Sequence, residues 1–458
     1  MPRYPTTRRL SRRELLKLGG SAAASLGLAA CAAPTTPVPA APAAEPTAAP
    51  AAAEPAAQPV ELRLTFWGDL ADMPTWKSGI DQWNQAQPNS KIKWENTPWG
   101  EYWTKLQTEV AGGSTLDVIG MVSMYSQQYI RQGALLPLDG FIEKEPDVKM
   151  DDFWPLIMTA YKWKNETYAL PYDLSTMCLM YNKKLFDEAG VKYPVEWTWE
   201  EFLDATQKLT KSTRGDGKID QFGYILPTFD WTIDVPLGTN KARFVSEDGL
   251  KCMLDSAEAT ETIQWLSDLC NKYHVAPTPG EAGDIPLFET GKAAITWGNP
   301  EFVQNLVQRI GPPRNNDKFL WDVAYFPKKQ QNANAVQGGS FSLGKSTKYP
   351  QEAWSFIKFY TSGPMLEAMV GKPSRGIPGR RSVAQSLITP DNPEHQQLFL
   401  DAVDLPSTST FIPAYQQAID IMRKYVDQIF LGQMTAADGL PKAVAELNPV
   451  LEKTASGA

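Results

Sequence analysis

The feature that most constrains the fold is a regular alternation of strand-like and helix-like segments. Residues 60–67 alternate apolar and polar side chains, which is the period of a half-buried strand. A helical spacing follows at Trp76, Ile80 and Trp83, and Pro88 ends it. Strands that alternate with helices predict an α/β fold with a mainly parallel, doubly wound sheet and helices on both faces.

The alternation continues to residue 133. It runs through a strand at 92–94, a helix with Tyr102, Leu106 and Val110, a strand at 116–122 and a helix at 126–132. Ligands of such sheets bind beyond the carboxyl ends of the strands. This rule directs attention to Trp67, which ends the first strand, and to Tyr125, which follows a later one.

Later segments repeat the pattern less regularly. Asn182 is placed to cap a helix, and Thr198 with Glu201 forms a capping box. Further helices are predicted over residues 350–360 and 415–431. Residues 60–458 number 399. This exceeds the ~250–300 residues that one hydrophobic core can serve, so two lobes are expected.

The first thirty residues have the composition of an export signal. Arg12 and Arg13 precede a weakly apolar run over residues 15–30, as in twin-arginine signal peptides. This run is shorter than the ~20 residues that a membrane-spanning helix needs. Leu28-Ala29-Ala30-Cys31 resembles a bacterial lipobox, which implies lipidation at Cys31. We expect residues 1–30 to be a signal peptide of an exported lipoprotein, anchored to the extracytoplasmic face of the cell membrane.

Residues 31–59 are expected to form a tether rather than a folded unit. Positions 32–59 hold thirteen Ala and eight Pro, and only two of them carry a charge. Such a stretch has too little apolar surface for a core, and its prolines favour extended polyproline geometry.

The composition of residues 60–458 excludes several classes of function. These residues carry 38 Lys and Arg against 49 Asp and Glu, a net charge of about −11. An acidic surface argues against nucleic acid as the main partner. Two histidines, His274 and His395, stand far apart in the sequence, which argues against a metal site or a catalytic triad. We expect no metal and no cofactor.

Three cysteines follow the lipobox, and the sequence leaves their state open. Cys252 and Cys270 could form one disulfide, or could remain buried thiols like Cys178.

Two motif matches are weak. Residues 339–346 fit the P-loop pattern, but their alternation predicts a strand. The acidic turn at residues 216–220 lacks the first and last ligands of a calcium loop, which favours a plain turn.

Several segments resemble family 1 extracellular solute-binding proteins, the sugar-binding, maltose-binding-protein-like subunits of ABC importers. The resemblance is carried by WKNETYALPYD (163–173), MYNKKLFDEAG (180–190), WTWEEF (197–202), GALLPLD (133–139), FETGKAAI (288–295) and GGS (338–340). The resemblance covers residues 60–458, and the matching segments occur in the same order as in the family. One departure is Ser123-Met124-Tyr125, where the family often has an acidic residue.

The resemblance implies a two-lobe fold with a hinge and a sugar held between the lobes. It places residues 60–169 and 293–345 in an N-terminal lobe, and residues 170–292 and 346–458 in a C-terminal lobe. It implies a monomer that binds a mono- or oligosaccharide, serves ABC permease subunits and is not an enzyme. The implied ligand-binding residues are Trp67, Tyr125, Tyr172, Asp173, Trp231, Trp297, Asn299, Gly338, Gly339, Ser340 and Arg375.

Two rival functions remain at this point. An extracellular carbohydrate-active enzyme, similar to a glycoside hydrolase, would also be acidic and rich in tryptophan. It requires two carboxylates at a fixed separation, and no local motif indicates such a pair. A purely structural surface lipoprotein is the second rival. For Tyr172 and Asp173, packing between the lobes is an open alternative to ligand contact.

Overall fold

The computed structural model describes residues 59–68, 73–226, 231–281 and 286–455. The predicted signal peptide and Cys31 lie outside this part of the chain, as does the predicted tether up to residue 58. In the described part, no helix is both long and apolar enough to cross a membrane.

The first sheet contains the strands that the sequence pattern predicts most clearly. Its order is β2–β1–β3–β13–β4, and β7 also pairs with β13. β1 pairs in parallel with β2 and with β3, whereas β13 runs antiparallel to β3, β4 and β7. The strands are β1 (Val60–Trp67), β2 (Ser90–Thr97), β3 (Val118–Val122), β4 (Leu135–Leu136), β7 (Ala169–Pro171) and β13 (Gly339–Gly344).

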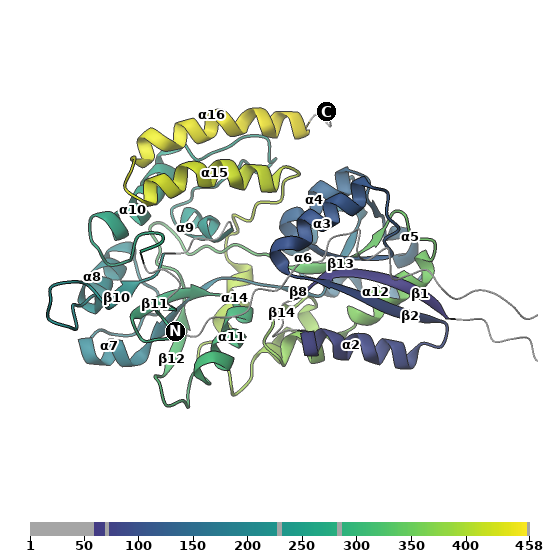
Figure 1. The fold of residues 1–458 in the computed structure, drawn as a ribbon, viewed down its shortest axis with the longest axis horizontal. Coiled ribbons are helices and arrows are strands. Elements are labelled where there is room, and N and C mark those ends of the chain that lie inside the picture. The colour runs from purple at the N-terminus through teal and green to yellow at the C-terminus, as the bar shows by residue number, and fades with distance from the viewer. Residues whose placement is uncertain (1–58, 69–72, 227–230, 282–285, 456–458) are drawn as a thin grey trace, which may run out of the picture. The chain divides into compact units, whose positions relative to one another are not determined.

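Helices cover both faces of this sheet (Figure 1). α2 (Met73–Ala86) and α12 (Pro350–Tyr360) pack on one face, where Trp76, Trp83 and Trp354 share a core with β1. α3 (Trp99–Ala111) and α4 (Ser123–Arg131) cover the other face. Gly113 follows the end of α3 at a φ of 69°, a left-handed conformation that favours glycine.

The second sheet is mixed. Its order is β10–β11–β9–β12; β10 and β11 run parallel, and β9 runs antiparallel to β11 and β12. The strands are β9 (Cys178–Asn182), β10 (Phe222–Tyr224), β11 (Ala293–Gly298) and β12 (Trp321–Ala324). The helices of this part are α7 (Lys183–Ala189), α8 (Trp199–Leu209), α9 (Asp234–Thr239), α10 (Ala257–Asn271), α11 (Pro300–Ile310), α14 (Gln397–Asp401), α15 (Tyr415–Phe430) and α16 (Ala436–Ala455).

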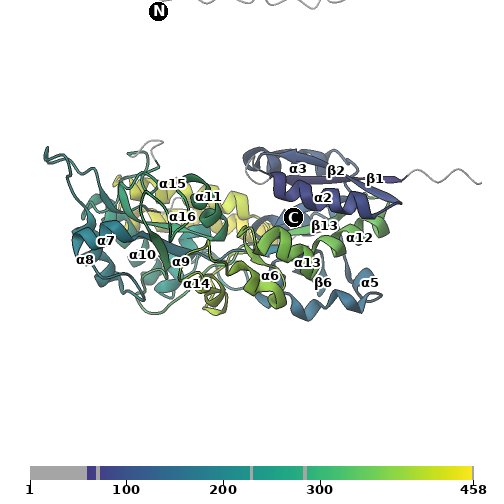
Figure 2. The same cartoon turned by 90° about the horizontal axis from the view of Figure 1, so that it is seen from below.

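The last two of these helices lie side by side (Figure 1, Figure 2). The sequence pattern predicts α15, which buries Ala418, Met422 and Val426 along one side. It does not predict α16, because Pro441 and Pro449 lie inside that helix and proline ordinarily ends one.

Shorter elements complete the described part. They are α5 (Asp139–Ile142), α6 (Pro155–Ala160), α13 (Gly363–Leu366), the π-helical Glu367–Gly371, the hairpin β5 (Lys162–Trp163) with β6 (Glu166–Thr167), and the pair β8 (Asp173–Leu174) with β14 (Ile377–Pro378). Short 3-10 helices lie at Pro146–Val148, Met150–Asp152, Trp231–Ile233, Arg381–Leu387 and Ala402–Asp404.

The α/β fold class is confirmed, but the expected lobe boundaries differ from the observed pairing in two places. β11 and β12 lie in the segment expected in the first lobe, yet they pair with β9 in the second sheet. α12 was expected in the second lobe, yet it packs with β1 and β13 in the core of the first. The chain therefore passes between the two sheets more often than the expected lobe boundaries imply. The reason is that the apolar sequence of a strand does not specify which sheet the strand joins.

Local sequence signals are largely confirmed. The side chain of Asn182 accepts a hydrogen bond from the amide of Leu185, and Thr198 with Glu201 forms the reciprocal capping box. Residues 339–344 form β13, and the next helix after this strand begins only at Pro350, so the P-loop geometry is not present. Cys178, Cys252 and Cys270 are buried free thiols, which excludes the disulfide in this structure.

Candidate functional site

The carboxyl ends of three strands meet at one edge of the first sheet. β1, β2 and β3 run parallel and end at Trp67, Thr97 and Val122. α3 begins at Trp99 and α4 at Ser123, so both helices start directly at this edge. This is the position where open α/β sheets hold their ligands.

Four aromatic side chains gather there, and we call Trp67, Trp99, Trp103 and Tyr125 the aromatic cluster. The ring centroid of Trp67 lies 5.3 Å from Trp99 and 5.6 Å from Trp103. Trp103 lies 4.2 Å from Tyr125. The structure therefore brings the predicted Trp67 and Tyr125 together, through two tryptophans that sequence reasoning missed. The sequence signal that could have indicated Trp99 is the pair Pro98-Trp99 at the start of a predicted helix.

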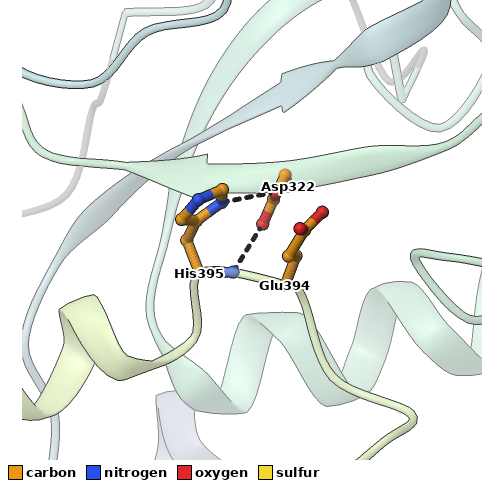
Figure 3. Close-up of side chains that lie close together, drawn as sticks. All are labelled: Asp322, Glu394 and His395. Atoms are coloured by element: carbon orange, nitrogen blue, oxygen red, sulfur yellow. Dashed lines mark hydrogen bonds and ion pairs between the residues drawn. The ribbon is translucent and has the colours of Figure 1, made fainter.

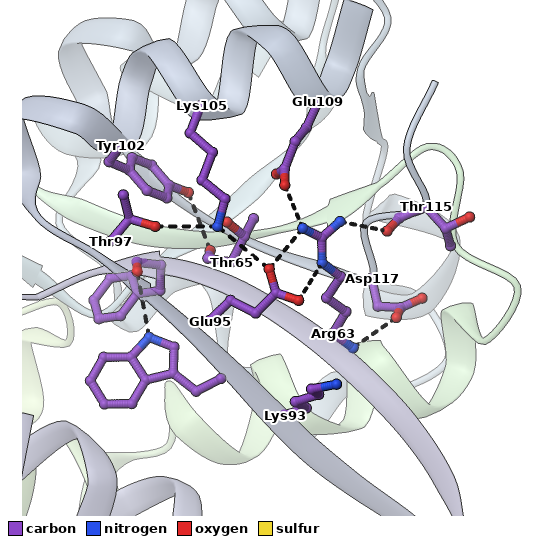
Figure 4. A network of polar contacts seen from close by, with 12 residues as sticks. Arg63, Thr65, Lys93, Glu95, Thr97, Tyr102, Lys105, Glu109, Thr115 and Asp117 are labelled. Carbon is purple, nitrogen blue, oxygen red and sulfur yellow. Dashed lines mark hydrogen bonds and ion pairs between the residues drawn. The ribbon is translucent and has the colours of Figure 1, made fainter. Parts of the chain in front are cut away.

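A polar network holds α3 against the sheet (Figure 4). The guanidinium of Arg63 on β1 donates to both carboxylate oxygens of Glu95 on β2, at 2.8 Å each. Glu109 of α3 also pairs with Arg63, and the ammonium of Lys105 lies 3.5 Å from Glu95. The hydrogen bond from Arg63 lowers the pKa of Glu95, and the bond to Glu95 raises the pKa of Arg63. The helix that carries Trp99 is thus fixed on both neighbouring strands.

Tyr125 also reaches the second part of the molecule. Its hydroxyl donates to Oε1 of Gln416 at 2.7 Å, and its ring meets Tyr415 edge-on at 5.7 Å. Both partners lie in the first turn of α15. The aromatic cluster therefore extends from the first sheet to α15, a helix that packs against α10 and α16.

Most of the predicted residues near β8 and the start of β13, where the chain crosses between the two sheets, are buried. Tyr172 is only 2% exposed, and burial raises the pKa of its hydroxyl well above the usual value. Its hydroxyl lies so close to Gly339 that a Cβ there would sit 2.0 Å away. Ser340 is fully buried and donates to the carbonyl of Met121 at 3.1 Å. The Gly338 carbonyl accepts from the hydroxyl of Tyr161 at 2.6 Å. Tyr172, Gly338 and Ser340 are therefore buried and held by contacts within the protein, and their contact with a ligand stays a prediction.

Asp173 and Arg375 supply charge near this crossing. Oδ1 of Asp173 accepts from the amide of Gly339 at 2.6 Å, and its side chain is partly exposed. The guanidinium of Arg375 lies over the Trp76 ring, 4.6 Å from its centroid, and Arg375 is 6% exposed. These contacts fix the orientation of both charged groups.

Three predicted residues lie with the second sheet. Trp297, at the end of β11, is half-buried and stacks with Phe302 at 6.0 Å. It lines a cavity of about 300 Å³ together with Ile225, Leu226 and Phe288, among others. Asn299 accepts a hydrogen bond from the amide of Phe302 and so caps α11, which gives it a structural role. Trp231 is half-buried and packs against the core that contains α10 and α15.

Comparison with known proteins identifies the family. The model for bacterial extracellular solute-binding proteins matches residues 67–363, well over half of the chain. The chain belongs to this family. A binding protein of Brucella abortus is 23% identical to this solute-binding protein over 378 residues, which cover 80% of this chain and 87% of the relative.

Relatives and solved structures of the family agree with the fold. The maltotriose-binding protein of Pyrococcus abyssi is 21% identical over 312 residues, 66% of this chain and 63% of the relative. An ABC substrate-binding protein from Listeria monocytogenes in complex with cycloalternan is similar at a TM-score of 0.77 and 21% identity, over 86% of this chain and 99% of that one. Maltose-bound MalE3 of Thermotoga maritima has a TM-score of 0.70 at 19% identity, over 85% and 100%. These relatives are described as binding proteins, which gives the glycoside hydrolase alternative no support.

One cluster in this solute-binding protein has the composition of a metal site. Asp322, Glu394 and His395 each offer a ligand atom within 4.8 Å of one another (Figure 3). The ammonium of Lys183, however, lies 3.2 Å from a carboxylate oxygen of Asp322 and 3.2 Å from one of Glu394. Nδ1 of His395 lies 2.8 Å from Asp322. Because the ammonium of Lys183 already pairs with both carboxylates, the cluster is best described as an ion-pair network.

The acidic turn at residues 216–220 has a similar explanation. Asp220 accepts hydrogen bonds from the amide and the hydroxyl of Thr213 and from Nε of Arg214 at 2.9 Å. Asp216 accepts from the amide of Lys218. The carboxylates are used within the turn itself, which supports the plain turn.

Proposed function

We propose that this chain captures a mono- or oligosaccharide outside the cell and delivers it to the permease subunits of an ABC transporter. The observation that carries the proposal is the aromatic cluster at the carboxyl edge of β1, β2 and β3. Aromatic faces contact the C–H faces of sugar rings, and nearby charged groups pair with hydroxyls that would otherwise be buried without partners. The maltotriose-binding relative and the structural relative in complex with cycloalternan support a carbohydrate as the ligand.

The proposed role needs binding and release, and no bond is broken. Asp173 and Arg375 are the charged groups we assign to the sugar hydroxyls, and Trp297 is assigned to a second aromatic contact. Two segments pass between the sheets, one from β7 to β9 and one from β12 to β13. They pair through Ser175 and Gln337, whose amides and carbonyls exchange hydrogen bonds at 2.6 and 3.1 Å. We assign the hinge to this pair, about which the lobes close on the sugar.

Location and anchoring form part of the same proposal. Twin arginines before an apolar run, followed by the lipobox and an Ala/Pro-rich stretch, favour export and lipidation at Cys31. The lipid would hold the protein at the extracytoplasmic face of the membrane, where a tethered monomer can collect sugar and meet its permease.

A thermal-shift screen against a carbohydrate panel tests this function. A ligand present at about 100 times its dissociation constant should stabilise the folded chain by about 2.7 kcal/mol. Amino acids and inorganic anions at the same concentrations serve as controls. Stabilisation by one of these controls, together with none by any sugar, would overturn the proposal, and turnover of a bound sugar would restore the enzyme alternative.

A further inference from the structure

A groove of about 540 Å³ opens beside the helices that cover one face of the first sheet. Its lining comes from α2, from α12, from the 3-10 helices at residues 146–152 and from the segment around Arg380, and we call it the α2–α12 groove. Gln87, which directly follows α2, also lines it. Two positions on, the carbonyl of Asn89 accepts a hydrogen bond from the amide of Val60, where β1 begins. The groove therefore starts at the amino edge of the sheet, opposite to the aromatic cluster, none of whose residues lines it.

Arg380 is the buried positive charge of the α2–α12 groove. It is 6% exposed, and its guanidinium lies 4.3 Å from the ring centroid of Phe153. Nε donates to the carbonyl of Thr361 at 2.6 Å, but Nη1 reaches the carbonyl of Lys149 and a carboxylate oxygen of Asp152 only at 3.5 Å, which is long for a hydrogen bond. Nη2 has no acceptor among the described residues. Burial lowers the pKa of Arg380, since the nearby Asp152 offsets the lost hydration only in part.

Two further donors of this groove have no acceptor within the described ranges. Trp83 is 2% exposed, and its indole Nε1 is buried without a hydrogen-bond partner. Lys149 lines the groove at a φ of 49°, a left-handed conformation that is uncommon for a residue other than glycine. Its ammonium forms no ion pair with any described carboxylate. A buried donor without an acceptor is costly, so these groups favour a ligand that accepts hydrogen bonds.

The carboxylates of the groove, in contrast, already have donors. Glu145 and Asp147 both pair with the ammonium of Lys358. Asp152 accepts hydrogen bonds from the amide and the hydroxyl of Ser382, at 2.8 and 2.7 Å. The unsatisfied groups of the groove are therefore donors, two of them positively charged, and a ligand with negatively charged oxygens complements them.

We propose that the α2–α12 groove binds a small organic phosphate. A phosphate monoester carries roughly −1.5 to −2 charge and three acceptor oxygens, enough for Arg380, Trp83 and Lys149 together, whereas a carboxylate has only two oxygens. The groove is larger than a bare ion, and Val148 and Phe359 give it an apolar part for the organic body. Residues 60–458 carry 38 basic against 49 acidic side chains, which opposes an anionic membrane or a polyanion and favours a small solute.

Calorimetry of the purified chain tests this site with three probes at constant ionic strength: phenyl phosphate, inorganic phosphate and benzoate. Phenyl phosphate should bind with a Kd below about 1 mM. It should bind more tightly than inorganic phosphate, which lacks the organic body, and more tightly than benzoate, which lacks the third oxygen.

Two substitutions address the unsatisfied charges. Arg380→Lys keeps the positive charge but lacks the forked guanidinium, and should weaken phenyl phosphate binding at least tenfold, about 1.4 kcal/mol. Lys149→Gly removes the ammonium, and glycine adopts the left-handed backbone without strain. It should weaken phenyl phosphate binding at least about threefold.

Arg381 supplies the matched control. It is the next residue after Arg380, its guanidinium donates to the carbonyl of Asp151 at 2.6 Å, and it does not line the groove. Arg381→Lys should leave phenyl phosphate binding unchanged. All of these variants should bind the sugar found in the carbohydrate panel with unchanged affinity, so this site and the proposed function are tested separately.

Urea unfolding shows whether each variant folds. If Arg380→Lys does not fold, Lys149→Gly decides together with Trp83→Phe, which removes the indole N–H, keeps an aromatic ring and should also weaken binding. Absence of saturable phenyl phosphate binding, equal weakening in Arg381→Lys, or unchanged binding in both Lys149→Gly and Trp83→Phe would overturn the proposal. Benzoate or inorganic phosphate that binds as tightly as phenyl phosphate would overturn the choice of an organic phosphate.

Discussion

Replacement of Trp297 by alanine separates a ligand contact from a core residue. The ring is half-buried at the end of β11, stacks on Phe302 and borders a cavity of about 300 Å³. Since the ring of Trp297 already borders this cavity, its removal loses few packing contacts. We expect Trp297→Ala to lower the free energy of unfolding by only about 1–2 kcal/mol, from partial burial and one aromatic pair.

Trp83 provides the matched core control. It is 2% exposed and packs against Phe356 and Phe359 in the core of the first sheet. Trp83→Ala should cost about 3–5 kcal/mol, the usual range for a buried tryptophan.

Urea unfolding measures both stabilities, and calorimetry with the sugar found in the panel measures affinity. We expect Trp297→Ala to bind at least tenfold more weakly. Tyr349, which follows β13 and is 40% exposed, is the control, and Tyr349→Ala should bind normally. A stability loss as large as that of Trp83→Ala would show that Trp297 is a core residue. Normal folding with unchanged affinity would remove it from the site.

Three further predictions address anchoring, closure and pH. Cys31→Ala should move the protein from the membrane fraction to the soluble fraction. If the variant stays in the membrane fraction and only detergent extracts it, the lipobox assignment is wrong. Small-angle scattering should show a smaller radius of gyration with saturating sugar, whereas an unchanged radius would count against hinge closure. The hydrogen bond from Arg63 is the main cause of the lowered pKa of Glu95. The ionised carboxylate of Glu95 therefore stabilises the folded chain at pH values above its ordinary pKa of 4.5, and this stabilisation is lost as the pH falls below 4.5 toward the lowered pKa. Glu95→Gln should therefore flatten the acid limb of the stability curve, as measured by urea unfolding from pH 6 to pH 3, and an unchanged limb would refute the coupling.

Much of the local structure could be predicted from the sequence. The apolar spacing of Trp76, Ile80 and Trp83 predicts α2, and these three side chains are buried in it. Asn182 and Thr198 predict helix starts, and both make the expected cap bonds. These signals are local, because side-chain period and capping depend on residues within one or two turns of each other.

The site was predicted only in part. Trp67 ends β1 and Tyr125 follows β3, and the carboxyl ends of these strands meet at one edge, so the strand pattern was enough to select both residues. Trp99 and Trp103 were missed because a tryptophan in a helix pattern ordinarily indicates core. The burial of Tyr172 was not predictable either, because it depends on close contact with Gly339, 167 positions along the chain.

The sequence by itself determined the periods of strands and helices, their caps and the acidic charge of the folded part. Only the tertiary structure decided that β11 and β12 join the second sheet, that α12 packs on the first, and that Trp99 stands exposed beside Trp67. The physical reason is that hydrophobic burial has no direction: an apolar face specifies that it must be covered, but not by which partner. Long-range backbone pairing and side-chain packing make that choice.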